Sequence, residues 1–305
     1  MTSYRLRAYI YLLIVALIWG AASPIIKFTL EGIDPLPFLA YRFAIASVFS
    51  IFFFLISGIS LPKPKNSIPL IILYGLLAVP IGLGALFAGL DRSTVLDLTL
   101  ITSIGPMVVI VGGAFFFRDH ITHREKIGVT IVLIGVFVNS LYPIFTSGLG
   151  ARITGNLYLL AFLLADSGAV LVAKLSVKRR IKSLTLTNFA FILGAITIIP
   201  ITVISYGGQN LINTIISLPF KYHLGVWYMA LISGTLAYFL FVRGHKSIEV
   251  SEAILFNYLQ PVFAIPLAVF WLGEKITTSF IIGATFIVIG LIIVEYKKKK
   301  LKPKI

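Results

Sequence analysis

Two stretches of the sequence, Phe115-Phe-Phe-Arg-Asp-His-Ile-Thr122 and Phe270-Trp-Leu-Gly-Glu-Lys-Ile-Thr277, end a hydrophobic run in the same way. In each, aromatic and apolar residues give way to a polar or small residue, an acid and a base, and the chain resumes with Ile-Thr. The two stretches lie 155 positions apart in a chain of 305 residues. This spacing indicates that one unit of sequence occurs twice.

The same offset of 155 aligns further residues in one register without gaps. Apolar matches are expected by chance in so apolar a chain, whereas matched proline and glycine are not. The matched pairs include Pro106 with Pro261, Gly128 with Gly283, Gly135 with Gly290, Gly89 with Gly244 and Thr130 with Thr285. We therefore predict a duplication, with a first repeat in residues 1–150, a second in 151–296 and a basic tail in 297–305.

The composition predicts an integral membrane protein. Hydrophobic residues make up 58% of the chain and charged residues 12%, and the mean hydropathy is +1.01. Soluble domains carry about 25% charged residues. Apolar runs of roughly 20 residues recur, which is the length that crosses a bilayer core as a helix. Alternating barrel strands are not seen, so we expect an all-α protein whose backbone groups are satisfied within each span.

Runs bounded by charge, Pro or Gly predict ten spans. They are 8–28, 36–57, 68–89, 94–117, 126–146, 154–174, 184–205, 222–243, 250–273 and 278–296. Five spans per repeat is an odd number, so the second copy must insert upside down. The predicted architecture is ten transmembrane helices as two inverted five-helix repeats. Such repeats build many secondary transporters, in which the two halves exchange access to a central site from either side of the membrane.

Lysine and arginine predict the orientation, because cytoplasmic loops carry an excess of both. With both termini in the cytoplasm of a multi-pass plasma-membrane protein, the inner ends hold Arg5, Arg7, Lys63, Lys65, Arg118, Arg124, Lys126, Lys174, Lys178, Arg179, Arg180, Lys182, Arg243, Lys246 and the tail lysines. The outer ends hold Lys27, Arg92, Arg152, Lys221 and Lys275. The net charge of +15 thus follows the topology. The tail is expected to attract anionic lipid, and no nucleic acid is expected as a partner.

Motifs of enzymes are missing from the sequence. The chain has no cysteine, and no GxSxG, HExxH, Walker or GxGxxG motif occurs. We expect no enzyme, no cofactor and no metal site, and without a nucleotide site any pumping must use ion or solute gradients. Two alternatives stay open. One is an intramembrane enzyme that uses Asp166, and the other is a membrane protein with a scaffold role.

Several motifs carry a resemblance to a known family. They are Trp19-Gly20 with Pro24, Arg42, Gly234–Gly244, Glu252-Ala253, Tyr258–Val262, Leu272-Gly-Glu-Lys275 and Gly283–Gly290. With them the chain resembles EamA-type members of the drug/metabolite transporter superfamily. The resemblance implies export or exchange of small organic metabolites, often amino acids, through a cavity surrounded by spans 1–4 and 6–9, with spans 5 and 10 peripheral. The chain departs from the family at Arg118-Asp119, where Gly-Glu is usual, and at Asp166, where an apolar or aromatic residue is common.

Asp166 and Arg42 are charged residues within predicted spans. A carboxylate near the bilayer centre costs about 2.5–3.5 kcal/mol on the insertion scale, so Asp166 should face a cavity or a partner. It is a candidate proton carrier or partner for a substrate amine, or else a neutral acid with a structural role. Arg42 either meets a substrate carboxylate, braces a neighbouring group, or extends outward to the interface.

Asp97 and Glu252 occupy equivalent repeat positions and are candidate gates. However, Thr94-x-x-Asp97 has the spacing of a helix-capping box, and both acids fall in first turns, where the helix dipole favours a negative charge. Capping is therefore the competing interpretation.

The polar residues Asn257, Tyr258 and Gln260 precede Pro261, and Pro106 lies in the sister span. A proline removes a helical hydrogen bond, so freed carbonyls and polar side chains near the midplane predict either a binding site or contacts that hold helices together. Aromatic walls of the cavity, or simple packing residues, are predicted at Trp19, Tyr74 and Tyr238.

Gly128 and Gly135, like Gly283 and Gly290, are two turns apart on one helix face, which permits close helix contact. Packing within one chain and a dimer interface both fit, so we expect a monomer or a homodimer. The other expected partners are a small-molecule substrate, membrane lipid and a coupling proton.

Overall fold

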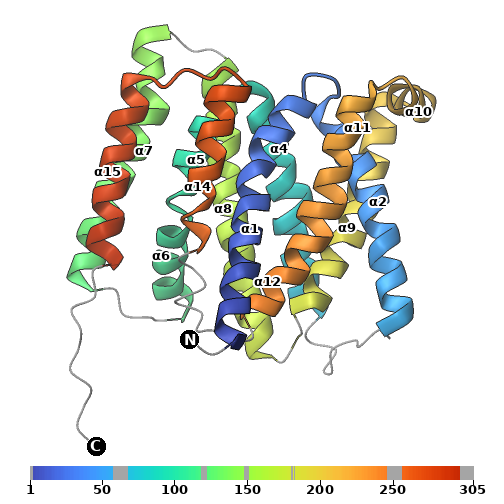
Figure 1. Ribbon diagram of the computed structural model, residues 1–305, viewed down its shortest axis with the longest axis horizontal. Coiled ribbons are helices and arrows are strands. Elements are labelled where there is room, and N and C mark those ends of the chain that lie inside the picture. Colours follow the sequence, from blue (N-terminus) through green and yellow to red (C-terminus); the bar gives the residue numbers. More distant parts are fainter. Residues whose placement is uncertain are drawn as a thin grey trace, which may run out of the picture.

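The fold is a bundle of helices that run up and down alongside one another (Figure 1). The computed structural model describes residues 3–57, 68–117, 122–147, 151–179, 181, 183–245 and 256–295. Across these residues the regular structure is helical, and no strand occurs. The polypeptide therefore satisfies its backbone hydrogen bonds within each segment, as a chain in lipid must.

Three of the helical segments have π-helical hydrogen bonding, and the others are α-helices. In chain order they are α1 (Ser3–Thr29), α2 (Pro35–Ser57), α3 (Ile68–Leu76), η2 (Leu77–Leu83), α4 (Gly84–Arg92), α5 (Val95–Thr102), α6 (Gly105–Phe117), α7 (His123–Ser147), α8 (Ala151–Lys178), α9 (Ser183–Tyr206), α10 (Gly208–Ile216), α11 (Phe220–Trp227), η3 (Tyr228–Leu236), α12 (Ala237–His245), α14 (Gln260–Pro266), η4 (Leu267–Trp271) and α15 (Thr278–Glu295).

The surface of the bundle suits a membrane. Within the described residues, seven helical segments are long and apolar enough to span a bilayer, and three shorter apolar helices accompany them. Large apolar side chains lie open on the outside, with Phe270 88%, Ile204 85% and Phe115 81% exposed. Such a surface is stable against lipid and would be an aggregation hazard in water. The prediction of an all-α membrane protein is confirmed, while ten spans and an inverted arrangement remain predictions.

The helical structure is interrupted next to Pro106 and next to Pro261. Helix α5 ends at Thr102 and α6 begins at Gly105, just before Pro106, and a turn likewise precedes α14, which contains Pro261. The turns share hydrogen bonds at the offset of 155. The Met107 amide donates to the Ile104 carbonyl at 2.9 Å, and the Val262 amide donates to the Leu259 carbonyl at 3.0 Å. Because proline has no N–H, one helical bond is lost at each site.

Helices α7 and α15, which cover the fifth and tenth predicted spans, pack against each other at one edge of the bundle (Figure 1). A Cβ atom on Gly135 would lie 2.7 Å from the Gly283 carbonyl oxygen, and one on Gly290 would lie 2.7 Å from that of Gly128. Only glycine permits this approach. The glycine faces therefore serve contact within one chain, one of the two predicted uses.

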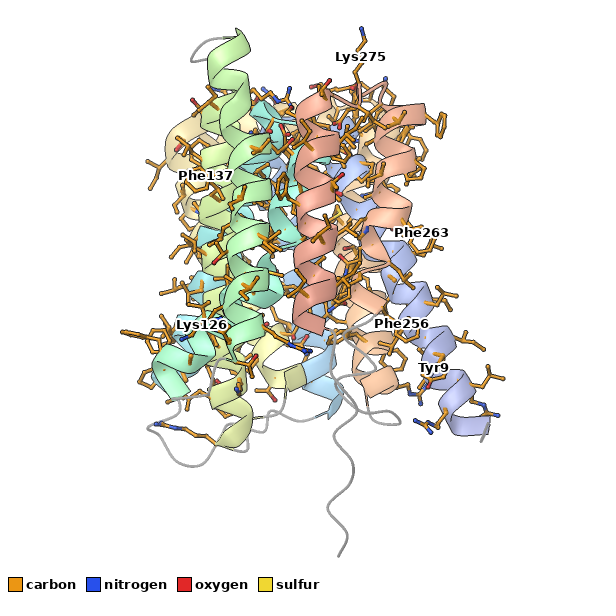
Figure 2. All side chains as sticks on the ribbon, turned by 90° about the vertical axis from the view of Figure 1, so that its left-hand side faces the viewer. Tyr9, Lys126, Phe137, Phe256, Phe263 and Lys275 are labelled. Atoms are coloured by element: carbon orange, nitrogen blue, oxygen red, sulfur yellow. The ribbon has the colours of Figure 1, made fainter. Side chains whose placement is uncertain are left out.

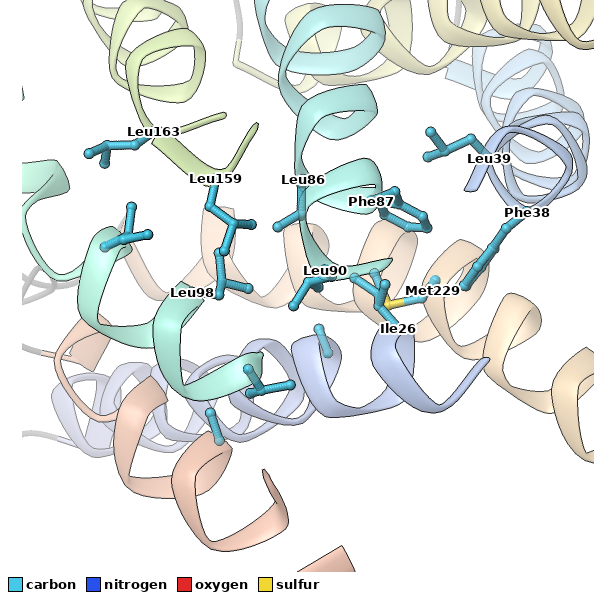
Figure 3. Close-up of a cluster of buried hydrophobic side chains, with 14 of the residues drawn as sticks. Ile26, Phe38, Leu39, Leu86, Phe87, Leu90, Leu98, Leu159, Leu163 and Met229 are labelled. Atoms are coloured by element: carbon cyan, nitrogen blue, oxygen red, sulfur yellow. The ribbon is translucent and has the colours of Figure 1, made fainter. Parts of the chain in front are cut away.

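A buried aromatic and aliphatic core runs through the bundle and includes residues of α7 and α15. Figure 3 shows Phe38 and Leu39 of α2 close to Phe87 of α4. The rings of Phe38 and Phe87 meet edge to face, with centroids 4.8 Å apart. This core fixes α2 against α4 and thereby places the neighbouring polar residue Arg42.

Helix α10 lies between the predicted spans 184–205 and 222–243, where no helix was predicted. Gly207 begins it with φ of 78°, a conformation that favours glycine. Its exposed Ile212 and Ile216 alternate with Asn210 and Asn213, which is the pattern of a short amphipathic helix. At nine residues it is too short to cross a membrane, and Figure 1 shows it lying across one end of the bundle.

Candidate functional site

The candidate site is centred on Asp166, near the middle of α8. Its side chain is exposed, whereas those of Ala165 and Ser167 on either side are buried. Tyr74 of α3 and Tyr238 of α12 lie near enough for the carboxylate to act on them electrostatically. It makes no ion pair or hydrogen bond with any residue that the structure describes. Among the described residues the Asp166 carboxylate thus has neighbours but no direct partner, and its role as a cavity acid stays a prediction.

Arg42 of α2 also lies near Tyr238. Its side chain is only 5% exposed, and its Nη1 atom has no hydrogen-bond partner among the described residues. The guanidinium carbon lies 5.4 Å from the ring centroid of Phe43 and 5.8 Å from that of Phe87. Arg42 also interacts electrostatically with Tyr238, but no ion pair joins it to Asp166. Aromatic faces stabilise the cation while leaving its N–H groups available.

Tyr238 is the residue that links the two charges, since it interacts with both. Its ring lies 5.3 Å from that of Trp19 and 6.1 Å from that of Phe191, measured between centroids. Trp19 is held in place because its Nε1 donates to the Ser233 carbonyl at 3.2 Å. Five predicted residues (Trp19, Arg42, Tyr74, Asp166 and Tyr238) thus lie in one cluster. Phe191 and Ser233 were not predicted.

Two π-helical segments adjoin the cluster. Segment η2 begins three residues after Tyr74, and η3 ends two residues before Tyr238. Pro80 lies inside η2, where its missing N–H favours a wider turn. Short π-helical segments are often found at functional sites, because they rotate the side chains that follow relative to a regular helix. No sequence signal identified η3 in advance.

Asn257 and Gln260 form a separate pair. Gln260 Nε2 donates to Asn257 Oδ1 at 3.4 Å, and within the described residues neither side chain hydrogen-bonds to Arg42 or Asp166. The Gln260 backbone instead packs on Gly20 of α1, where an added Cβ would lie 2.7 Å from its carbonyl oxygen. Tyr258 lies in the turn before α14. For these residues the interpretation as helix contacts is favoured over a place in the cavity.

Asp97 is fully buried, and three side chains donate four hydrogen bonds to its carboxylate. Arg152 donates to it from Nε at 2.8 Å and from Nη2 at 3.0 Å, Asn139 Nδ2 donates at 2.9 Å, and Ser93 Oγ donates at 3.1 Å. The capping prediction is confirmed for Thr94, whose hydroxyl accepts from the Asp97 amide at 3.0 Å. The Asp97 carboxylate joins α5 to α7 and α8, which sequence spacing did not reveal.

Some predicted residues lie outside the described part of the chain. They are the second candidate gate Glu252, the departures from the family at Arg118 and Asp119, and the tail 297–305.

Glu274 binds the N-terminus of α5 from the other half of the chain. Its two carboxylate oxygens accept from the amides of Val95 at 2.7 Å and Leu96 at 3.0 Å. Gly273, with φ of 68°, turns the chain so that the side chain can reach them. Burial raises the pKa of the Glu274 carboxyl above its ordinary value, although the two backbone amides and Lys27 act in the opposite direction. This acid of the opening motif is thus a helix cap.

Known proteins share both the sequence and the fold. An uncharacterised transporter of Archaeoglobus fulgidus is 26% identical over 96% of this chain and 100% of its own length. A protein of Salmonella typhimurium named "Probable amino-acid metabolite efflux pump" is 23% identical over 92% of both chains. One solved crystal structure aligns over 97% of both chains with a TM-score of 0.58 at 16% identity, which shows likeness of fold alone.

The family match covers nearly the whole chain in two consecutive segments, residues 6–141 and 153–296. The family and these relatives are transporters, which points to a protein that is not an enzyme. The chain therefore belongs to the EamA-like transporter family.

Proposed function

We propose that this protein is a secondary transporter that exports or exchanges a small zwitterionic metabolite, an amino acid or a related compound. The membrane-length helices and the family support transport in general. The relative named as an amino-acid metabolite efflux pump supports the class of solute. We further propose that the protein lies in the plasma membrane with both termini in the cytoplasm.

The observation that carries the proposal is a pair of opposite charges near Tyr238, Arg42 and Asp166, which make no ion pair or hydrogen bond with any described residue. An unpaired charge is costly inside a membrane protein, so each charge needs a partner for at least part of the working cycle. An amino acid brings both partners. Its carboxylate suits the planar fork of Arg42, and its ammonium suits the carboxylate of Asp166. Trp19 and Phe191 would pack on its side chain.

The proposed mechanism is alternating access between two inverted repeats. The proline breaks at the offset of 155 share their hydrogen bonds, and the family matches the chain twice, which supports a duplicated design. At one end, contacts join different spans: Glu274 caps α5, and Lys27 Nζ donates to the Leu90 carbonyl at 2.6 Å. We propose that this is the extracellular end and that these contacts break when the site opens outward.

Asp166 also offers a route for a coupling proton. An acid that is charged when it holds a substrate ammonium must be neutralised when the substrate leaves, and a proton can do so. In that case the proton and the ammonium would compete for the same carboxylate, which is the arrangement of an exchanger.

Reconstitution in proteoliposomes tests the proposal. Vesicles preloaded with one unlabelled amino acid are diluted into a labelled amino acid, and a panel covers acidic, basic and neutral side chains. Accumulation of unmodified label that depends on the internal amino acid is expected for at least one member. Failure of every amino acid in active, correctly inserted protein would overturn the zwitterion proposal, and chemical conversion of the solute without flux would indicate an enzyme.

A further inference from the structure

A second cavity lies between α6, α7 and α8. Its volume is about 480 Å³, within the range of about 300–1,000 Å³ that holds small ligands. It opens on the outer surface of the bundle, since Val111 and Leu133 are about half exposed and Phe115 is mostly exposed. Its walls include Val108, Val111 and Phe115 of α6, Val129 and Leu133 of α7, and Leu171 of α8.

This groove is distinct from the Arg42–Asp166 cluster, with which it shares no residue. Its walls are apolar apart from Ser167, whose buried hydroxyl has no hydrogen-bond partner in the described residues. An amino acid would find no charged or polar partners here. Because the walls belong to apolar helices and open sideways, the groove is continuous with the surface that faces lipid. Its occupant must therefore come from the bilayer.

The chemistry at one end of the groove selects among lipids. Lys126 lies three residues before Val129 and seven before Leu133, so all three share one face of α7. Its side chain is exposed and makes no ion pair with any described residue. Figure 2 shows Lys126 at the same end of the molecule as Tyr9 and at the opposite end from Lys275. Lys126 therefore lies at an end of the bundle, where lipid headgroups would lie.

We propose that this groove is a binding site for an anionic phospholipid. One acyl chain lies between α6, α7 and α8, and the headgroup phosphate binds the Lys126 ammonium. Lipid tails are as apolar as the wall residues, so burying the chain gives no hydrophobic gain over the surrounding bilayer. The shape of the groove holds the chain, and Lys126 supplies the preference for negative charge.

Native mass spectrometry of the full-length, delipidated protein tests the proposal with phosphatidylglycerol and phosphatidylcholine of equal chain length. The wild type is expected to bind phosphatidylglycerol about fivefold more tightly, as one surface lysine predicts. Lys126→Gln should abolish this preference and leave phosphatidylcholine binding unchanged. Val111→Trp, which fills the groove, should weaken binding of both lipids by about tenfold. Leu133→Trp fills the groove from α7 and should act alike.

Two matched variants serve as controls. Arg7→Gln removes an exposed cation at the same end of the molecule, and Val288→Trp adds the same bulk to the exposed face of α15. Both should bind as the wild type does. Equal binding of the two lipids by the wild type, or unchanged binding in both groove-filling variants, would overturn the proposal. Displacement of bound phosphatidylglycerol by free glycerol phosphate, which has no acyl chain, would also overturn it. If the groove-filling variants lose a dimer but still bind lipid, the occupant of the groove is a second copy of the chain.

Discussion

Among single residues, Asp166 offers the sharpest test, because it carries a charge without a partner in the described residues. Asp166→Asn removes the charge but breaks no ion pair. We expect the melting temperature to stay equal or rise, since a carboxylate in the bilayer centre costs about 2.5–3.5 kcal/mol. Exchange of amino acids should fall at least about tenfold, as loss of one charged hydrogen bond predicts. Asp91→Asn, at a surface ion pair, is the control and should transport normally. A destabilised Asp166→Asn protein with normal exchange would make the acid structural.

Arg42 is expected to bind the carboxylate of the solute. Arg42→Gln keeps hydrogen-bonding ability but loses the charge and the fork. The preference for an amino acid over the amine that lacks its carboxylate should fall by roughly 10-fold to 100-fold, which corresponds to about 1.5–3 kcal/mol for a charged hydrogen bond. Competition assays in proteoliposomes measure this ratio, and Arg92→Gln provides a control at an exposed arginine. If Arg42→Gln lowers the affinity for the amino acid and for the amine equally, Arg42 supports the cavity without contacting the carboxylate.

The sequence revealed those residues of the cluster that differ in kind from their surroundings. Asp166 and Arg42 are charges within apolar runs, and Trp19, Tyr74 and Tyr238 carry polar tips on aromatic rings. Phe191 was missed because one phenylalanine among many carries no signal of its own. Ser233 was missed because it acts through its backbone carbonyl. Asn257 and Gln260 looked equally distinctive, but which side of a helix faces the cavity depends on packing that one sequence does not reveal.

At the scale of elements, the contact between α7 and α15 should tolerate no side chain at Gly135. A Cβ there would lie 2.7 Å from the Gly283 carbonyl oxygen, a backbone atom that cannot move alone. Gly135→Ala should therefore destabilise the protein by about 1–3 kcal/mol, the usual penalty for overpacking. Gly84→Ala is the matched control, because nothing lies within 4 Å of its added Cβ, and helix propensity favours alanine. Thermal unfolding in detergent measures the melting temperatures of both variants. If Gly135→Ala melts at the same temperature as the wild type, the two helices can move apart without a cost in stability.

The Glu274 cap on α5 predicts a dependence of stability on pH. Because burial raises the folded-state pKa of this carboxyl, the folded protein binds the proton more readily than the unfolded chain. Stability from this group should therefore increase as the pH falls through the folded pKa and decrease as it rises. Glu274→Gln should remove this pH dependence of stability and keep part of the cap on α5. Glu274→Ala should lower the free energy of unfolding by about 0.5–2 kcal/mol at any pH. Melting temperatures between about pH 4 and 8 check this, and parallel curves for wild type and Glu274→Gln would contradict it.

Element boundaries were largely predictable, because a membrane limits each helix to an apolar run between charges or prolines. Helix α8, for example, covers residues 151–178 where the run predicted 154–174. Helix α10 was not predicted because it is a short amphipathic helix across one end of the bundle, and it has no long apolar run. The π-helical turns escaped because their hydrogen bonds depend on neighbouring helices. Glu274 was seen as half of a repeated motif, but its partner on α5 is 178 residues away.

For the whole molecule, an inverted duplication predicts that positions related by the offset of 155 lie on opposite sides of the membrane. The chain has no cysteine, so single-cysteine variants need no altered background. Lys275→Cys should react with a membrane-impermeant maleimide in intact cells, because it lies at the proposed extracellular end. Lys126→Cys, exposed at the opposite end in Figure 2, should react only after the cells are permeabilised.

His120→Cys extends the test, because position 120 is the equivalent of position 275 in the first repeat. It should label together with Lys126→Cys and oppositely to Lys275→Cys. Since Lys126 and Lys275 lie at opposite ends of one bundle, labelling of both from the same side would contradict a bundle that crosses the membrane. A full reversal, with Lys275→Cys protected and the other two exposed, would keep the fold and the inversion but overturn the orientation predicted from lysine and arginine.

The same Lys275→Cys variant tests the proposed outer gate. If the Glu274 contact beside it opens during the transport cycle, adding a transported amino acid should change the labelling rate of Lys275→Cys. A labelling rate that no substrate changes would place the outer gate elsewhere.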